Sequence, residues 1–376
     1  MTGPLAPPAD PDPDTDTDLA TDPRVHAPHR LGDLVVAPVG WGTLPLTGGY
    51  GAAPGGRTDE LVGRLLDVVL AGGQAPPLVD TADFYGAGAV EEQLGRTLGH
   101  RRDDVVLAGR GGAVVDGPGR PRRIDGSPAH LRRACEASLR RLRTDHLDLY
   151  SLARVDPRVP LEESVGALHD LVRAGLVRHV GLSEVTGEEL RRACAVGPVA
   201  AVASEWSLVS RDVEADVVPV ARALGVVIVA CSPLARGLLG GGVPEPGEGD
   251  YRRNHPRFAP GNLPGNNRLA RRAAALAAAA GWDPAAAALA WVLGAGDGAR
   301  DVVALVGTVR PAHLRTACAA AHRDLPPAVR AGLEACFPVG GVAGDRRPRV
   351  PGTAADPTTA PASVETASSA ERDARP

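Results

Sequence analysis

The chain has 376 residues, a formal net charge of −4 and 44% hydrophobic residues. This length accommodates one barrel domain with tails, and the lack of a basic face argues against nucleic acid as a partner. No apolar stretch approaches the roughly 18 residues of a membrane span, and the N-terminus lacks the pattern of a signal peptide. We therefore expect neither a membrane partner nor a leader.

Five cysteines are spread along the chain without a C-x-x-C pair: Cys135, Cys194, Cys231, Cys318 and Cys336. Their odd number and spacing predict reduced thiols in a cytoplasmic protein, and argue against a zinc site or any other metal centre. All of the 41 basic residues are arginine. Codon bias in a GC-rich genome explains such a composition.

The chain divides into a central domain and two tails. The composition of residues 1–29 predicts a disordered acidic tail. The composition of residues 343–376, which are rich in Pro, Thr, Ala and Ser, predicts a second disordered tail. Between them, residues 30–342 alternate short apolar runs with amphipathic helical runs. This alternation predicts βαβ units and a parallel sheet.

Eight apolar runs are predicted strands: 35–40, 77–80, 105–108, 147–150, 177–181, 199–203, 226–230 and 302–306. The predicted helices include 58–71 and one that begins at Ser127, with Thr58 and Ser127 as N-caps, and also 160–174, 186–195, 214–224, 267–280 and 283–293. Eight strands with helical crossovers favour an α/β fold of the closed (β/α)8 TIM barrel type. An open dinucleotide-binding sheet is the rival, but Pro45 occupies the third glycine position of its G-x-G-x-x-G motif.

Catalytic residues of such barrels follow the carboxyl ends of the strands. Asp80 and Tyr85 follow the second predicted strand, and Arg110 follows the third. A tyrosine can donate a proton near neutral pH when a nearby cation lowers its pKa. Arg110 could supply this cation, with Asp80 pairing with Arg110. An ordinary Asp–Arg pair at the barrel rim, with Tyr85 packed beside it, is the alternative.

A second group of residues could bind a nucleotide. A glycine-rich loop, 232–242, follows the seventh predicted strand, and Gly307 and Thr308 precede a helix after the eighth. Backbone N–H groups and a helix N-terminus bind phosphate at this place in barrels, and Trp206 could stack on a flat ring. The alternatives are that the loop is merely flexible, that Gly307 and Thr308 only cap the helix, and that Trp206 is an ordinary aromatic residue at the barrel rim.

Together these motifs resemble the aldo/keto reductases, in particular their bacterial branch, over about residues 30–320. The matching stretches include Gly40-Trp-Gly-Thr43, Asp80-Thr-Ala-Asp-Phe-Tyr-Gly86, Asp145-His-Leu-Asp-Leu-Tyr150, Gly181-Leu-Ser-Glu184, Ser204-Glu-Trp-Ser207, Ser232-Pro-Leu-Ala-Arg-Gly237 and Pro256-Arg-Phe258.

The resemblance implies hydride transfer from NADPH to a small-molecule aldehyde or ketone. The family uses Asp, Tyr, Lys and His, in which Tyr donates the proton, Lys lowers its pKa, Asp anchors Lys and His orients the carbonyl. Asp80 and Tyr85 match this pattern. Arg110 occupies the Lys position and Ala153 the His position, so the catalytic tetrad is altered.

The resemblance also implies a cofactor site for NADP, with Arg236 and Arg310 as phosphate partners and Trp206 stacked on the nicotinamide. Preference between NADP and NAD stays open, because Ala203, Thr316 and Ala317 stand where the family has polar contacts. The implied cofactor residues are Trp41, Ser183, Glu184, Trp206, Ser232, Pro233, Leu234, Arg236, Gly237, Gly307, Thr308, Arg310 and His313.

Two functions follow from this pattern. The first is a working oxidoreductase with a modified proton-relay site. The second is a catalytically impaired reductase barrel that acts as a nucleotide-binding or regulatory protein. The sequence indicates no oligomeric state.

Overall fold

A computed structural model describes residues 28–346, apart from 51–56, 74, 116–122 and 296–300. Eight parallel strands form a closed barrel in the order β10-β11-β12-β3-β4-β5-β8-β9, which confirms the predicted (β/α)8 fold. The barrel strands are β3 (Val39–Gly42), β4 (Leu78–Asp80), β5 (Val106–Gly111), β8 (Leu147–Leu152), β9 (Val177–Ser183), β10 (Val199–Glu205), β11 (Val227–Cys231) and β12 (Val302–Gly307).

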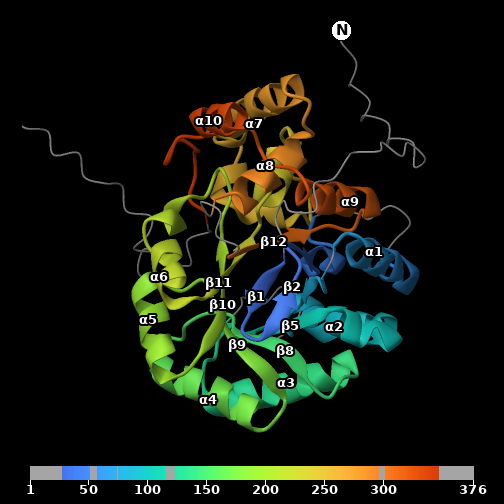
Figure 1. Ribbon diagram of the computed structural model, residues 1–376, viewed down its shortest axis with the longest axis vertical. Coiled ribbons are helices and arrows are strands. Elements are labelled where there is room, and N and C mark those ends of the chain that lie inside the picture. Colours follow the sequence, from blue (N-terminus) through green and yellow to red (C-terminus); the bar gives the residue numbers. More distant parts are fainter. Residues whose placement is uncertain (1–27, 51–56, 74, 116–122, 296–300, 347–376) are drawn as a thin grey trace, which may run out of the picture.

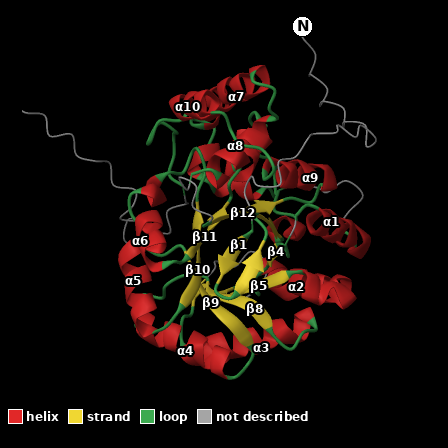
Figure 2. Cartoon of the chain, viewed as in Figure 1, coloured by secondary structure: helices red, strands yellow, loops and turns green. Residues whose placement is uncertain are grey.

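Helices surround the barrel on all sides (Figures 1 and 2). Thr58 and Ser127 are N-caps as predicted, since their side chains accept hydrogen bonds from the amides of Leu61 and His130. Helices α2 and α10 are additional to the predicted ones. The bounds are α1 (Asp59–Ala71), α2 (Ala89–Leu98), α3 (Pro128–Leu142), α4 (Leu161–Arg173), α5 (Gly187–Val196), α6 (Val217–Leu224), α7 (Leu263–Ala279), α8 (Pro284–Leu293), α9 (Pro311–Ala320) and α10 (Pro327–Cys336).

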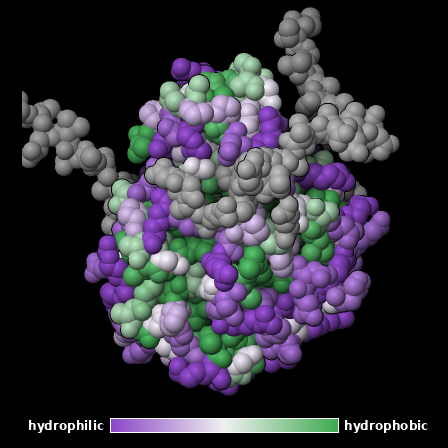
Figure 3. Space-filling model, viewed as in Figure 1, coloured by the Kyte–Doolittle hydropathy of each residue, from purple (hydrophilic) through white to green (hydrophobic). Residues whose placement is uncertain are grey.

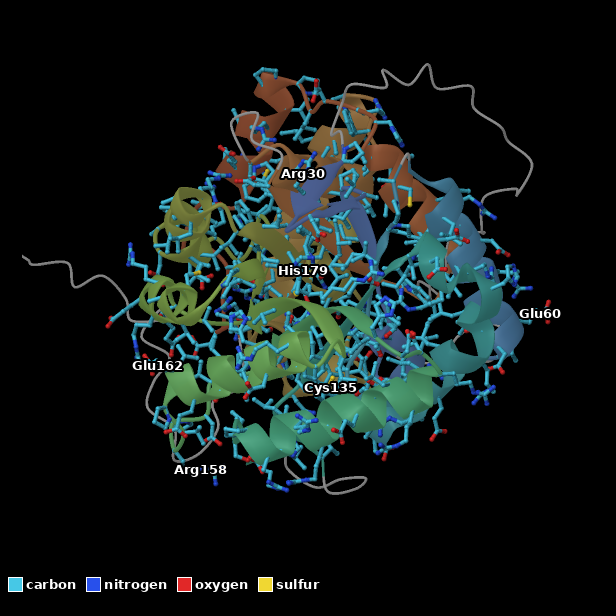
Figure 4. All side chains as sticks on the ribbon, turned by 60° about the horizontal axis from the view of Figure 1, so that its bottom comes forward. Arg30, Glu60, Cys135, Arg158, Glu162 and His179 are labelled. Atoms are coloured by element: carbon cyan, nitrogen blue, oxygen red, sulfur yellow. The ribbon has the colours of Figure 1, made fainter. Side chains whose placement is uncertain are left out.

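The first predicted strand, 35–40, is divided between two elements. Strand β2 (Leu34–Val36) pairs with β1 (His29–Leu31) in an antiparallel hairpin, and the barrel strand β3 begins only at Val39. The reason is Pro38, which has no N–H to donate and separates the two strands. The hairpin covers the barrel interior at the amino ends of the strands, where His179 Nε2 lies 2.5 Å from Asp33 Oδ1. In Figure 4, His179 is labelled near the middle of the molecule, inside the circle of helices.

The predicted tails lie outside the described residues, except for 28–29 and 343–346. His29 begins β1 and is buried, and Arg346 is also buried. Arg346 contacts the carboxylates of Glu184 and Asp212 at 3.3 Å and 3.4 Å. Arg346, which belongs to the predicted C-terminal tail, therefore packs against the barrel domain.

Two separate cores follow from the alternation of side chains along each strand. One core fills the barrel interior and includes Leu78, Val106, Ala108, Leu149, Ala203 and Val229. The other lies between strands and helices and includes Trp41, Val79, Leu107, Tyr150, Val202 and Trp206. A residue that lies two positions from one of these interior residues on the same strand therefore also faces the barrel axis.

The surface seen in Figure 3 mixes hydrophilic residues with smaller apolar areas. Among the described residues, no single helix has the length and apolar character needed to cross a membrane, although the bent pair of α7 and α8 reaches that threshold by length and composition.

Two helix glycines provide a test of how closely the outer helices pack. A Cβ on Gly95 of α2 would lie 2.2 Å from the carbonyl oxygen of Arg141 in α3. We expect Gly95→Ala to lower the free energy of unfolding by about 1–3 kcal/mol, because backbone atoms would have to move apart. Urea denaturation followed by circular dichroism measures this change.

Gly166 of α4 is the matched control, since nothing in the described chain lies within 4 Å of a Cβ there. Gly166→Ala should raise the free energy of unfolding by about 0.5–1 kcal/mol through helix propensity. Equal effects of the two substitutions would contradict the packing of α2 against α3.

Candidate active site

A buried ion pair occupies the barrel interior at the carboxyl ends of the strands. Asp80 ends β4, whose register pairs it with Ala108 of β5. Arg110 lies two residues further along β5, on the same face as Ala108. Its Nε lies 2.9 Å from Asp80 Oδ2, and both side chains are buried.

The guanidinium of Arg110 also contacts two strands further around the barrel. Nη1 donates to Ser183 Oγ of β9 at 3.0 Å, and Nη2 lies 3.6 Å from Cys231 Sγ of β11. Burial alone would lower the pKa of Arg110, but Asp80 and Cys231 raise it well above its ordinary value. Arg110 is therefore a permanent cation at this site.

Tyr85 begins the short 3-10 helix η2 (Tyr85–Gly88), which follows β4. Its amide donates to the carbonyl of Ala82 at 3.0 Å, and its ring packs edge-on against Phe84. Tyr85 is half-buried and interacts electrostatically with Arg110. The fold thus brings together Asp80, Tyr85 and Arg110, the three residues that the sequence singles out.

Ala153 directly follows β8, and its amide donates to the carbonyl of Gly111 at 2.8 Å. Its side chain is buried. The next residue, Arg154, places Nη1 2.6 Å from the Ala153 carbonyl oxygen and 3.5 Å from Ser183 Oγ. From the sequence, Arg154 is one of the residues that follow the fourth predicted strand, but no catalytic or binding role was predicted for it.

The loop after β11 has an unusual backbone. Ser232, Ala235 and Arg236 have φ values of 48°, 47° and 58°, and Gly237 has 92°. Left-handed conformations are costly for non-glycine residues and are often found at functional sites. They also turn successive N–H groups toward one side, which suits an anion. Pro233 and Leu234 belong to the same turn.

Gly307 and Thr308 lie beside this loop, because β12 pairs with β11. Gly307 is exposed, and α9 begins at Pro311. Arg310 is the N-cap residue of α9, and Arg310 and His313 are both exposed. The helix N-terminus and the left-handed loop together offer backbone donors of the kind that a dinucleotide phosphate needs.

Three predicted cofactor side chains occupy other positions. Trp41 and Trp206 belong to the outer core, because their place in the strand alternation turns them away from the barrel axis. Trp206 Nε1 donates to Glu214 at 3.0 Å, and Trp41 Nε1 donates to the carbonyl of Thr308 at 3.0 Å. Arg236 pairs with Glu205 at 2.7 Å instead of pointing to open solvent. We correct the expectation that Trp206 stacks on the nicotinamide, and Trp41 holds the backbone at Thr308.

Glu205 is the centre of an ion-pair cluster that sequence analysis missed. Arg236 and Arg257 both contact its carboxylate, and Arg346 donates to its carbonyl. Burial would raise the pKa of Glu205, but these arginines lower it to about 2. Glu184, with a φ of 59°, accepts from the Glu205 amide at 3.0 Å. Glu184 is thus a structural partner of this cluster.

Near Tyr85 in the chain lie the buried carboxyl group of Glu91 and the partly buried carboxyl group of Asp83. Glu91 pairs with Arg141 at 2.7 Å. In the described chain, Oδ1 of Asp83 and Oε1 of Glu91 have no hydrogen-bond partner. Burial and repulsion from Glu91 raise the pKa of Asp83 to about 7, although Arg141 opposes this shift. The described residues contain no group of three or more His, Cys, Asp or Glu suited to a metal ion.

Comparison with known proteins gives a consistent result. Residues 38–337 match the Aldo/keto reductase family. The chain is 39% identical over 318 residues to a probable aldo-keto reductase from Glycine max, covering 83% of this chain and 88% of that protein. A glycerol dehydrogenase from Gluconobacter oxydans has a TM-score of 0.71 at 27% identity, covering 83% of this chain and 95% of that one. An aldo/keto reductase from Klebsiella pneumoniae in complex with NADP and acetate has a TM-score of 0.61 at 26% identity, covering 81% and 93%.

The raised pKa of Asp83 makes stability depend on pH. Its value in the folded protein, about 7, lies above the ordinary 3.8. The stability that protonated Asp83 contributes is therefore fully present below about pH 4 and is lost as pH rises through about 7. Asp83→Asn, which resembles the protonated form, should be more stable than the native chain by about 1–3 kcal/mol at about pH 8, and much less so at about pH 5.

Urea denaturation at the two pH values measures the difference. The exposed Asp104→Asn is the control and should show no such pH dependence. A constant gap between Asp83→Asn and the native chain across this range would exclude a raised pKa at Asp83.

Proposed function

The chain belongs to the aldo/keto reductase family, and we propose that it reduces a small-molecule aldehyde or ketone with NADPH. Members of this family act on small-molecule carbonyl compounds. The observation that carries the proposal is the buried Asp80–Arg110 pair with Tyr85 beside it at the carboxyl end of the barrel.

Each of the three residues has a separate role in this reaction. Tyr85 donates its phenolic proton to the carbonyl oxygen of the substrate. The charge of Arg110 stabilises the phenolate that is left, in the way that the family's Lys does. Asp80 fixes the orientation of Arg110 through the 2.9 Å contact. Arg110 does not itself relay a proton, since a guanidinium stays protonated.

The residues that would bind NADPH are those of the left-handed loop, 232–237, and of the segment 307–313. Their backbone donors and the N-terminus of α9 fit its phosphates. Arg310 and His313, exposed on the first turn of α9, are the side chains placed to contact them. When bound, NADPH supplies the hydride. Ser183 lies beside Arg110 and would face the nicotinamide. NADP complexes of the Klebsiella pneumoniae relative support this choice of cofactor.

The five cysteines are free thiols, which supports a reducing compartment, and we place the reaction in the cytoplasm.

A second candidate function is nucleotide binding without turnover. The observation that favours it is Ala153, which has no donor for a carbonyl oxygen where the family's pattern has His.

Calorimetric titration with NADPH, together with NADPH oxidation in the presence of reactive aldehydes, tests the proposal. We expect binding and turnover. Binding without turnover would favour the nucleotide-binding alternative, and the absence of both at millimolar NADPH would contradict each candidate function.

Tyr85→Phe tests the proton donor. We expect kcat/KM to fall by about 10²–10⁴, the usual contribution of a positioned acid, with NADPH affinity unchanged. Tyr150→Phe is the matched control, because the Tyr150 hydroxyl is buried in the outer core and has no hydrogen-bond partner among the described residues. A Tyr85→Phe enzyme as active as Tyr150→Phe would refute the role of Tyr85.

A further inference from the structure

The side chain of Arg154 returns to the barrel mouth from the position after Ala153. Strand β8 pairs with β9, and Ser151 of β8 lies opposite Gly181. Ala153 lies two positions after Ser151, just past the end of the strand, and thus continues the row of side chains on the same face. The guanidinium of Arg154 lies against the carbonyl oxygen of Ala153. A cationic donor group therefore lies next to the place where the resemblance puts His.

Arg154 and Arg110 contact the same hydroxyl. Nη1 of Arg154 lies 3.5 Å from Ser183 Oγ, and Nη1 of Arg110 lies 3.0 Å from it. The charge of Arg154 also acts on Cys231 of β11. Its guanidinium is thus placed among residues of β5, β9 and β11, at the same end of the barrel as Tyr85.

Carbonyl reduction needs a donor at this place. As the carbonyl carbon accepts a hydride from the reduced nicotinamide, the π electrons move onto the oxygen, which then takes the proton of Tyr85. A donor directed at that oxygen stabilises the charge as it forms. A guanidinium has five N–H donors in a rigid planar group and keeps all its protons. It can therefore orient a carbonyl oxygen without taking part in proton transfer.

We propose that Arg154 is a catalytic residue that donates an N–H to the carbonyl oxygen of the substrate, in place of the His that is absent at position 153. This inference rests on the proposed carbonyl reduction. Alanine at position 153 is then part of the arrangement, because its small side chain leaves the guanidinium room beside Ser183.

The test is Arg154→Gln, with the exposed Arg173→Gln of α4 as the matched control. We expect kcat for a reactive aldehyde to fall by about 10²–10³ in Arg154→Gln, as when one oxyanion donor is lost. NADPH affinity and the melting temperature should stay the same, and Arg173→Gln should keep the native rate. If Arg154→Gln folds poorly, Arg154→Met carries the same expectation.

Rescue separates a catalytic role from a structural one. Adding Ala153→His to Arg154→Gln should recover about tenfold or more of the lost rate, because His supplies a donor from the neighbouring position. A native rate in Arg154→Gln, or a loss that Ala153→His does not recover, would overturn the role of Arg154. If the Arg154 test fails in this way while the native chain is active and Tyr85→Phe is not, the proposed reductase function still holds. A native chain without turnover would instead overturn both.

Discussion

The carboxylate of Asp80 and the guanidinium of Arg110 meet inside the barrel, and the geometry of the candidate site depends on that contact. Removing two charges from water costs several kcal/mol for each, which close and well-oriented pairing must offset. Burial raises the pKa of Asp80, and contact with Arg110 opposes that rise. The pairing of β4 with β5 fixes the separation of the two residues, so the register of these neighbouring strands is what permits the ion pair.

The fold could be predicted because eight apolar runs separated by helical segments admit few arrangements. The caps at Thr58 and Ser127 were predictable for a local reason: each depends on an amide three residues away. The direction in which each side chain points was harder to predict from the sequence. Barrel strands are buried on both faces and show little polar alternation, so the sequence did not reveal that Trp41 and Trp206 face the helices.

Contacts between distant residues were beyond sequence reasoning. Arg346 reaches the carbonyl of Glu205 across 141 positions, and Arg257 reaches its carboxylate across 52. These contacts tie the loop after β10 to distant parts of the chain, and Arg236 pairs with the same carboxylate of Glu205. A motif that places Arg236 near a phosphate cannot show this competition, because the competing carboxylate belongs to another strand. Asp80, Tyr85 and Arg110 were identified because they follow neighbouring strands.

Arg110 and the segment that contains Ala153 are physically connected through Ser183. Arg110 donates from three nitrogens to Asp80, Ser183 and Cys231, on three different strands. A guanidinium is a rigid planar group, so its donors to these three strands keep fixed directions relative to one another. Arg154 contacts the same hydroxyl from beside Ala153. Arginine at 110 and alanine at 153 therefore form one arrangement, in which two guanidinium groups surround a serine. Tyr85 lies within the electrostatic field of Arg110, so the same arrangement also sets the charge that the phenol faces.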